Sequence, residues 1–153
     1  MTGRALVVLA LCLGLAGCAS GPREGSLDDL KTSSDQTDAD KRARVRMELA
    51  AGYFARGQSA TALDEVKLAL AARPDLPEAF NLRGLIYAAL GEPRLAEESF
   101  RRALQLAPRD ADAMHNYAWF LCQAARFAES DAQFKLALAQ PQYRDTVRTL
   151  MAQ

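Results

Sequence analysis

Acidic and basic side chains four residues apart are the first candidates for chemistry in this sequence. Glu97 precedes Arg101 and Glu98 precedes Arg102 at this spacing, which places each pair on one face of a helix. Neighbouring carboxylates can act as a general acid and a general base, but charges at this spacing are typical of the solvated face of an amphipathic helix. We therefore expect these pairs to support an exposed helix face, without a catalytic role.

His115, the only histidine, is the next candidate. A zinc site needs several ligands at suitable spacing, and the sequence around His115 offers no cluster of cysteines or carboxylates. The sequence also lacks a glycine-rich phosphate loop and a serine nucleophile elbow. It therefore predicts no catalytic residue, no metal, no cofactor and no enzyme activity.

Cys18 stands in a segment that points to covalent modification. Arg4 is followed by an apolar run from Ala5 to Ala16, which is too short for a permanent membrane span and is typical of a secretory signal. The small residues directly before Cys18 resemble the recognition pattern of the lipoprotein signal peptidase; a plain signal peptide is the alternative. We predict a signal peptide over residues 1–17 and a covalent lipid, including palmitate, on Cys18.

The predicted location is the outer membrane. Because Ala19, not an aspartate, follows the cysteine, the usual sorting pattern favours the inner leaflet of that membrane, with the chain facing the periplasm. Without residues 1–17 the chain has 18 basic and 19 acidic residues, and this balance excludes a nucleic-acid partner. Cys122 would then be the only unmodified thiol, either as a small buried residue or as an unpaired one.

Residues 18–40 are predicted to form a lipidated flexible tether. The stretch is rich in Ser, Gly, Thr and Asp, and its only sizeable apolar side chains are Leu27 and Leu30. Such a composition buries too little apolar surface to fold alone. The alternative is that the two leucines dock on a partner or on the folded body.

The rest of the chain is organised by a period of 34 residues. A period of this length indicates stacked helical hairpins, and residues 77–110 closely resemble the tetratricopeptide repeat. In that copy small residues occupy helix crossings, large ones fill the space beside them, a glycine makes the turn and a proline ends the second helix. These residues are Gly84, Tyr87, Gly91, Ala96, Phe100, Ala103 and Pro108.

The predicted fold class is therefore an all-α tetratricopeptide-repeat solenoid over residues 41–153. Its repeats cover about 43–76, 77–110 and 111–143, with a terminal helix over 144–153. The first helix of the first repeat is expected to begin near Lys41, and Asp110 is expected to cap the first helix of the third repeat. The terminal helix, with Val147, Leu150 and Met151 on one side, is expected to cover the last apolar face.

The first helices of such repeats line a concave groove, which we predict to be the binding site. Its side chains are mostly apolar and could take the apolar face of a partner helix, while two asparagines could bond an extended backbone. The groove lacks the cations with which related arrays hold a terminal carboxylate, so it should not select acidic C-termini. The predicted groove residues are Met47, Phe54, Asn81, Leu82, Leu85, His115, Asn116 and Trp119.

The order of these features resembles one particular family. The predicted lipid site is followed by SDQTDADKRARVRMELAAGYFARG, two regular repeats and HNYAWFLCQAARFAESDAQF. This order is similar to that of the type IV pilus biogenesis and stability lipoproteins, the pilotins. The resemblance implies an outer-membrane adaptor that binds the pilus secretin and promotes its localisation and oligomerisation. It implies no nucleic acid and no small-molecule substrate.

The resemblance ends near Tyr143. Family members continue into further repeats, and one of these often supplies a second cysteine that could pair with Cys122, whereas this sequence stops at Gln153. The resemblance therefore implies a shortened member with an incomplete groove. Two other functions stay open at this stage. One is a general envelope scaffold for peptidoglycan-modifying enzymes, and the other is a purely structural pilus-stability factor.

Overall fold

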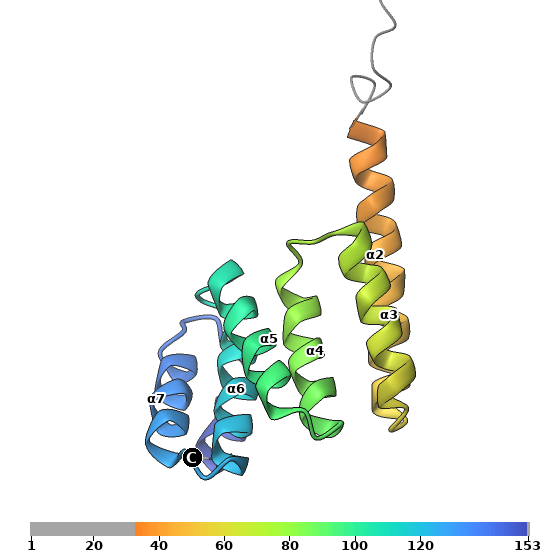
Figure 1. Cartoon of the computed structure of the whole chain (residues 1–153). Coiled ribbons are helices and arrows are strands. Elements are labelled where there is room, and N and C mark those ends of the chain that lie inside the picture. Colours follow the sequence, from red (N-terminus) through yellow and green to blue (C-terminus); the bar gives the residue numbers. More distant parts are fainter. Residues whose placement is uncertain (1–32, 153) are drawn as a thin grey trace, which may run out of the picture. The chain divides into compact units, whose positions relative to one another are not determined.

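The computed structural model describes residues 33–152, with side chains from Asp38 onward. All regular elements of this part are α-helices, arranged as successive antiparallel hairpins (Figure 1). The predicted all-α tetratricopeptide-repeat solenoid is thus confirmed. None of these helices combines the length and apolar character needed to cross a bilayer. The helices are α2 (Ser33–Ala55), α3 (Ser59–Ala72), α4 (Pro77–Ala89), α5 (Pro93–Leu106), α6 (Ala111–Gln123), α7 (Phe127–Leu138) and α8 (Thr146–Ala152).

The residues that recur at the 34-residue period form the core of each hairpin. Val66, Phe100 and Phe134 occupy equivalent positions of α3, α5 and α7, and each is at most 1% exposed. Phe100 lies against Gly84 of α4, where an added Cβ atom would come within 2.7 Å of the ring. The glycine therefore permits the close helix crossing that the sequence predicts.

The turns inside the first two hairpins depend on glycine. Gly57 and Gly91 have φ angles of +75° and +76°, in the left-handed region that other residues disfavour. The third hairpin makes the same turn with Ala125, whose φ is +57°. The third repeat thus keeps the turn geometry while carrying a strained residue there.

Replacing Ala125 by glycine is expected to raise the free energy of unfolding by about 0.5–1 kcal/mol, since relief of the left-handed strain outweighs the greater freedom of glycine in the unfolded chain. Urea unfolding followed by circular dichroism measures the change. Gly91→Ala is the matched control and should cost a similar amount, because nothing lies within 4 Å of the added Cβ and only backbone strain acts. An unchanged or lower stability of Ala125→Gly would contradict the assignment of strain.

The predicted repeat start at residue 77 and the predicted cap at Asp110 both mark helix starts in the structure. Pro77 and Pro93 lie in the first turns of α4 and α5, where the missing N–H group costs nothing. The Asp110 side chain accepts a hydrogen bond from the backbone N–H of Ala113 at 3.0 Å. The predicted N-cap of the third repeat is thus confirmed.

The start of α2 corrects the prediction. The helix begins at Ser33, about two turns before Lys41, so residues 33–40 of the predicted tether are helical. This segment has neither Gly nor Pro to interrupt a helix. It also gains an ion pair between Asp40 and Arg73 at the end of α3, which links residues 33 apart. The predicted signal peptide, Cys18, Leu27 and Leu30 lie outside the described residues.

Candidate functional site

The predicted groove residues come from first helices that lie side by side, since α4 contacts both α2 and α6. Met47 and Phe54 of α2 and Leu82 of α4 pack, partly buried, against one apolar cluster that includes Val66 and Ile86. Their side chains thus serve the core and also keep some exposed surface. We call Met47, Phe54, Asn81, Leu82, Leu85, Asn116 and Trp119 the first-helix surface.

The centre of the first-helix surface joins α4 to α6. The Asn116 side-chain amide donates a hydrogen bond to Asn81 Oδ1 at 3.2 Å. This bond does not use the Asn81 amide N–H groups or Asn116 Oδ1, which are a donor and an acceptor of the kind that an extended peptide needs. Leu85 packs beside the Phe100 cluster, and Trp119 is 47% exposed. Apolar and amide groups are therefore adjacent on this surface.

A small hollow of about 340 Å³ continues this surface at the α2–α4 boundary. Met47 and Leu76 supply its apolar lining, and Arg44, Glu78 and Arg73 are among its charged residues. The first repeat thus offers an apolar contact surrounded by charges of both signs. Such a mixture suits an amphipathic partner segment better than a purely apolar one.

His115 corrects the groove prediction. It is only 6% exposed, its Nδ1 lies 2.7 Å from Thr149 Oγ1 of α8, and its ring meets Phe134 edge-on with centroids 5.4 Å apart. Phe134 and Thr149, which follow His115 by 19 and 34 positions, therefore enclose the imidazole. His115 is a hydrogen-bonded core residue and does not line the accessible surface.

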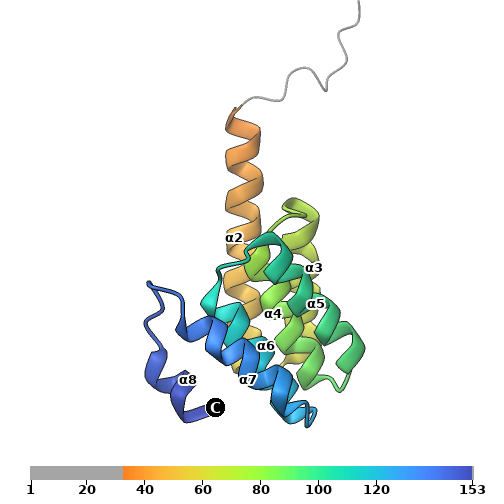
Figure 2. The ribbon, with the colours of Figure 1, turned by 90° about the vertical axis from the view of Figure 1, so that its left-hand side faces the viewer.

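The terminal helix turns the opposite side inward from the one that the sequence predicts. Thr149 is fully buried, whereas Val147, Leu150 and Met151 are 68%, 61% and 84% exposed. The Thr149 hydroxyl lies 2.7 Å from His115 Nδ1 and 2.6 Å from Tyr143 Oη. These polar contacts satisfy the hydroxyl and explain why this side of α8 faces inward. The helix follows α7 and packs against it (Figure 2). It covers His115 and leaves its own apolar side exposed.

Lowering the pH from about 7.5 to about 5.5 is expected to loosen α8. Burial lowers the pKa of His115, and nearby Arg148 acts in the same direction, whereas Asp112 and Asp145 oppose it. The unfolded or undocked state therefore binds a proton more readily, and docking weakens as the pH falls below the ordinary histidine value. Amide hydrogen exchange should show lower protection of the Thr149 N–H group, which bonds the Asp145 carbonyl.

Two controls show whether His115 causes this pH dependence of α8 docking. Asparagine has no ionisable side chain, so in the His115→Asn variant the protection of α8 against hydrogen exchange should vary little with pH. The carboxylate of Glu97 should stay ionised throughout, because a hydrogen bond from Arg126 lowers its pKa. Equal pH dependence in the wild type and in His115→Asn would show that another group controls the docking of α8.

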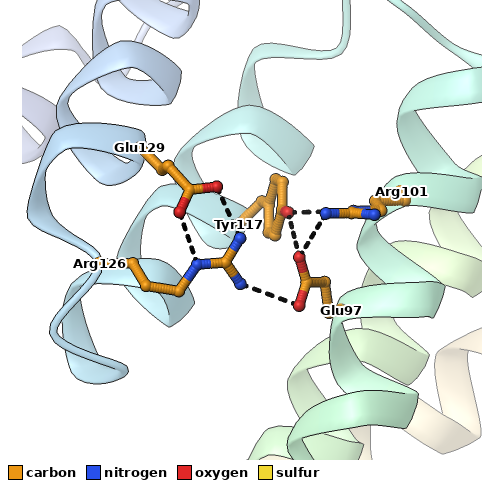
Figure 3. A network of polar contacts seen from close by, with 5 residues as sticks. All are labelled: Glu97, Arg101, Tyr117, Arg126 and Glu129. Carbon is orange, nitrogen blue, oxygen red and sulfur yellow. Dashed lines mark hydrogen bonds and ion pairs between the residues drawn. The ribbon is translucent and has the colours of Figure 1, made fainter.

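A polar network that the sequence did not predict joins the second repeat to the third (Figure 3). Glu97 accepts hydrogen bonds from Arg101 at 2.7 Å, from the Tyr117 hydroxyl at 2.9 Å and from Arg126 at 2.9 Å. Arg126 also donates twice to Glu129, at 2.7 and 2.6 Å. Only the pairing of Glu97 with Arg101 was predicted. The carboxylate therefore holds α5 against α6 and the start of α7.

The second predicted pair takes other partners. Arg102 donates to Gln105 at 3.3 Å and lies over the Phe80 ring at 5.8 Å. Cys122 is a half-buried free thiol. Within residues 33–152 no group of three or more His, Cys, Asp or Glu side chains is placed to hold a metal ion.

Comparison with known proteins finds a matching repeat family and relatives named for type IV pilus assembly. Residues 77–110 match the tetratricopeptide repeat family. Over 130 residues the chain is 32% identical to the type IV pilus assembly protein PilF of Pseudomonas aeruginosa, an alignment that covers 85% of this chain and 49% of PilF.

Two solved structures agree with this result. A Pseudomonas aeruginosa PilF structure superposes with a TM-score of 0.73 at 26% identity, covering 75% of this chain and 52% of that one. The structure of PilW, described as a widely conserved type IV pilus biogenesis factor, gives a TM-score of 0.68 at 33% identity and covers 72% and 50%. The chain thus spans about half the length of the relatives it matches.

Proposed function

We propose, from the premise that this chain is a tetratricopeptide-repeat protein related to the type IV pilus factors PilF and PilW, that it is an adaptor in type IV pilus biogenesis. Lipid on Cys18 would hold it at the outer membrane, facing the periplasm. The first-helix surface would bind a segment of the pilus secretin. In this role the anchored protein binds the secretin at the outer membrane and so promotes secretin localisation and oligomerisation, without a chemical step.

The observation that carries the proposal is the chemistry of the first-helix surface. Leu82 and Leu85 offer partly buried apolar surface, and Trp119 stands 47% exposed on the neighbouring helix. An exposed tryptophan beside apolar side chains is a frequent anchor of protein interfaces. The paired amides of Asn81 and Asn116 lie on the same helices. Together these groups suit an amphipathic protein segment.

Two variants of the first-helix surface test this proposal. Leu82→Glu places a charge in the apolar part, and Trp119→Ala removes the aromatic anchor; each is expected to weaken secretin binding by about tenfold or more, as for other central interface residues. Affinity is measured with the purified periplasmic part of the secretin. Leu136→Glu, on the second helix of the third repeat and similarly exposed at 48%, is the control and should bind normally.

The outcomes separate the proposal from its rivals. Circular dichroism must show unchanged helicity for the variants. Normal secretin binding by both variants would show that the secretin contacts another surface. Recovery of peptidoglycan-modifying enzymes without secretin in a pull-down would favour the general envelope scaffold. Secretin multimers that persist after deletion of this protein would favour a purely structural role.

A further inference from the structure

In the first hairpin α2 passes the C-terminal end of α3 (Figure 1). A second surface lies between these two helices. Here the two helices line an open hollow of about 710 Å³. We call it the basic hollow. It is lined by Lys41, Arg42, Val45, Arg46, Leu49, Leu68, Ala71 and Ala72, and it shares none of these residues with the first-helix surface.

The floor of the basic hollow is apolar and exposed. Val45, Leu49 and Leu68 keep 54%, 41% and 48% of their surface accessible. Val45 and Leu49 are one turn apart on α2, and Leu68 faces them from α3. Scattered exposed apolar residues need no explanation, but three that line one hollow form a contiguous apolar area.

The rim of the basic hollow is positively charged. Lys41, Arg42 and Arg46 border it, and its lining includes no carboxylate. Arg46 is paired with Glu65 at 2.9 Å, and Lys41 lies 3.8 Å from Asp38 in a largely exposed pair, which is worth little. An anionic surface that also accepts short apolar side chains is therefore the complementary partner.

The position of this surface in the chain argues for a membrane as that partner. The stretch from the proposed lipid site at Cys18 to the residue before α2 comprises only residues 18–32. Whatever their conformation, fifteen residues reach at most about 50 Å. Lys41 lies only about 12 Å further along α2, at 1.5 Å per residue. The basic hollow thus begins only 23 residues after the proposed anchor, from Cys18 to Lys41.

We propose that the basic hollow binds anionic phospholipid headgroups of the membrane in which the chain is anchored. The lysine and arginine side chains contact headgroup phosphates, while Val45, Leu49 and Leu68 enter the headgroup region. The inference rests on the proposed anchoring for its biological setting. Because the contact is electrostatic and shallow, it is weak alone and orients an anchored protein with its first hairpin toward the bilayer.

The test uses a chain that cannot be acylated, so that the anchor plays no part. Residues 18–153 carrying Cys18→Ser are sedimented with vesicles of phosphatidylcholine, with or without phosphatidylglycerol. We expect binding only to the anionic vesicles, and its loss when salt rises from about 0.05 M to about 0.5 M. Lys41→Glu with Arg42→Glu should weaken that binding by about tenfold or more.

The matched control reverses two arginines at the other end of the body. Arg109 and Arg144 border a separate hollow, and Arg109→Glu with Arg144→Glu changes net charge by the same amount. This control should bind anionic vesicles nearly as well as the parent chain. Circular dichroism should show the same helicity in all three proteins. A second variant, Leu49→Ser with Leu68→Ser, should also weaken binding and keeps every charge.

Three results would overturn the proposal. The first is equal binding to both vesicle types, and the second is equal loss in the two charge-reversal variants. The third is absence of vesicle binding together with capture of an acidic protein through Lys41 and Arg42, which would make the hollow a protein interface. None of these results bears on secretin binding by the first-helix surface or on acylation of Cys18, so failure here is distinguishable from failure of the proposed function.

Discussion

Replacing Phe100 by alanine is expected to lower the free energy of unfolding by about 3–5 kcal/mol, the cost of removing a buried aromatic side chain and leaving a cavity. The ring is fully buried. It lies 5.7 Å from the Tyr117 ring and 5.6 Å from the Phe120 ring, between centroids. Phe100 therefore joins the second repeat to the third, and its loss removes contacts on both sides of that boundary.

Chemical denaturation followed by circular dichroism measures this loss. Leu95→Ala on the same helix is the control, because Leu95 is 40% exposed and should cost under about 1 kcal/mol. A cost below about 1.5 kcal/mol for Phe100→Ala would show that the hairpins are held together elsewhere.

A double variant examines the contact between Phe100 and Gly84. In the wild type, an added Cβ at Gly84 would come within 2.7 to 2.9 Å of three ring atoms, so Gly84→Ala is expected to cost about 1–3 kcal/mol by overpacking. Once the ring is absent the same methyl group fills part of the cavity. Gly84→Ala should therefore be neutral or stabilising in the Phe100→Ala background, and strict additivity would contradict direct contact.

Replacing Cys18 by serine is expected to abolish membrane anchoring, because the hydroxyl cannot take the place of the thiol in the lipid linkage. Growing cells fed radiolabelled palmitate should label the wild-type chain and leave the variant unlabelled. In fractionated cells the variant should leave the outer membrane, and the secretin should lose its normal location with it. The effect on anchoring is all or none, since stable attachment depends on the acyl chains.

The chain contains two matched controls for this experiment. Cys12→Ser alters a residue of the predicted signal peptide, which is removed, and Cys122→Ser alters a half-buried thiol of α6. Both variants should incorporate palmitate normally. Absence of label in the wild-type protein would remove the basis for an anchored adaptor, whatever the first-helix surface binds.

Much of the fold follows from short-range information in the sequence. The small residues Gly84 and Ala96, the turn glycines and the N-cap Asp110 act through steric and hydrogen-bonding rules that involve a few neighbouring residues. Their recurrence every 34 residues is enough to predict three hairpins and their order. All residues of the first-helix surface come from the predicted groove set, because a repeat position specifies which side of a helix a residue occupies. His115 is the predicted member that is buried.

The sequence by itself therefore determined the helices, their pairing and the absence of recognisable catalytic motifs. The tertiary structure decided which polar groups are used internally. Thr149 meets His115 across 34 residues, Arg126 meets Glu97 across 29, and Arg73 meets Asp40 across 33. These contacts bury His115, turn the apolar side of α8 outward and accompany the earlier start of α2. Local periodicity cannot specify them, because each depends on how one helix is placed against another that is distant in sequence.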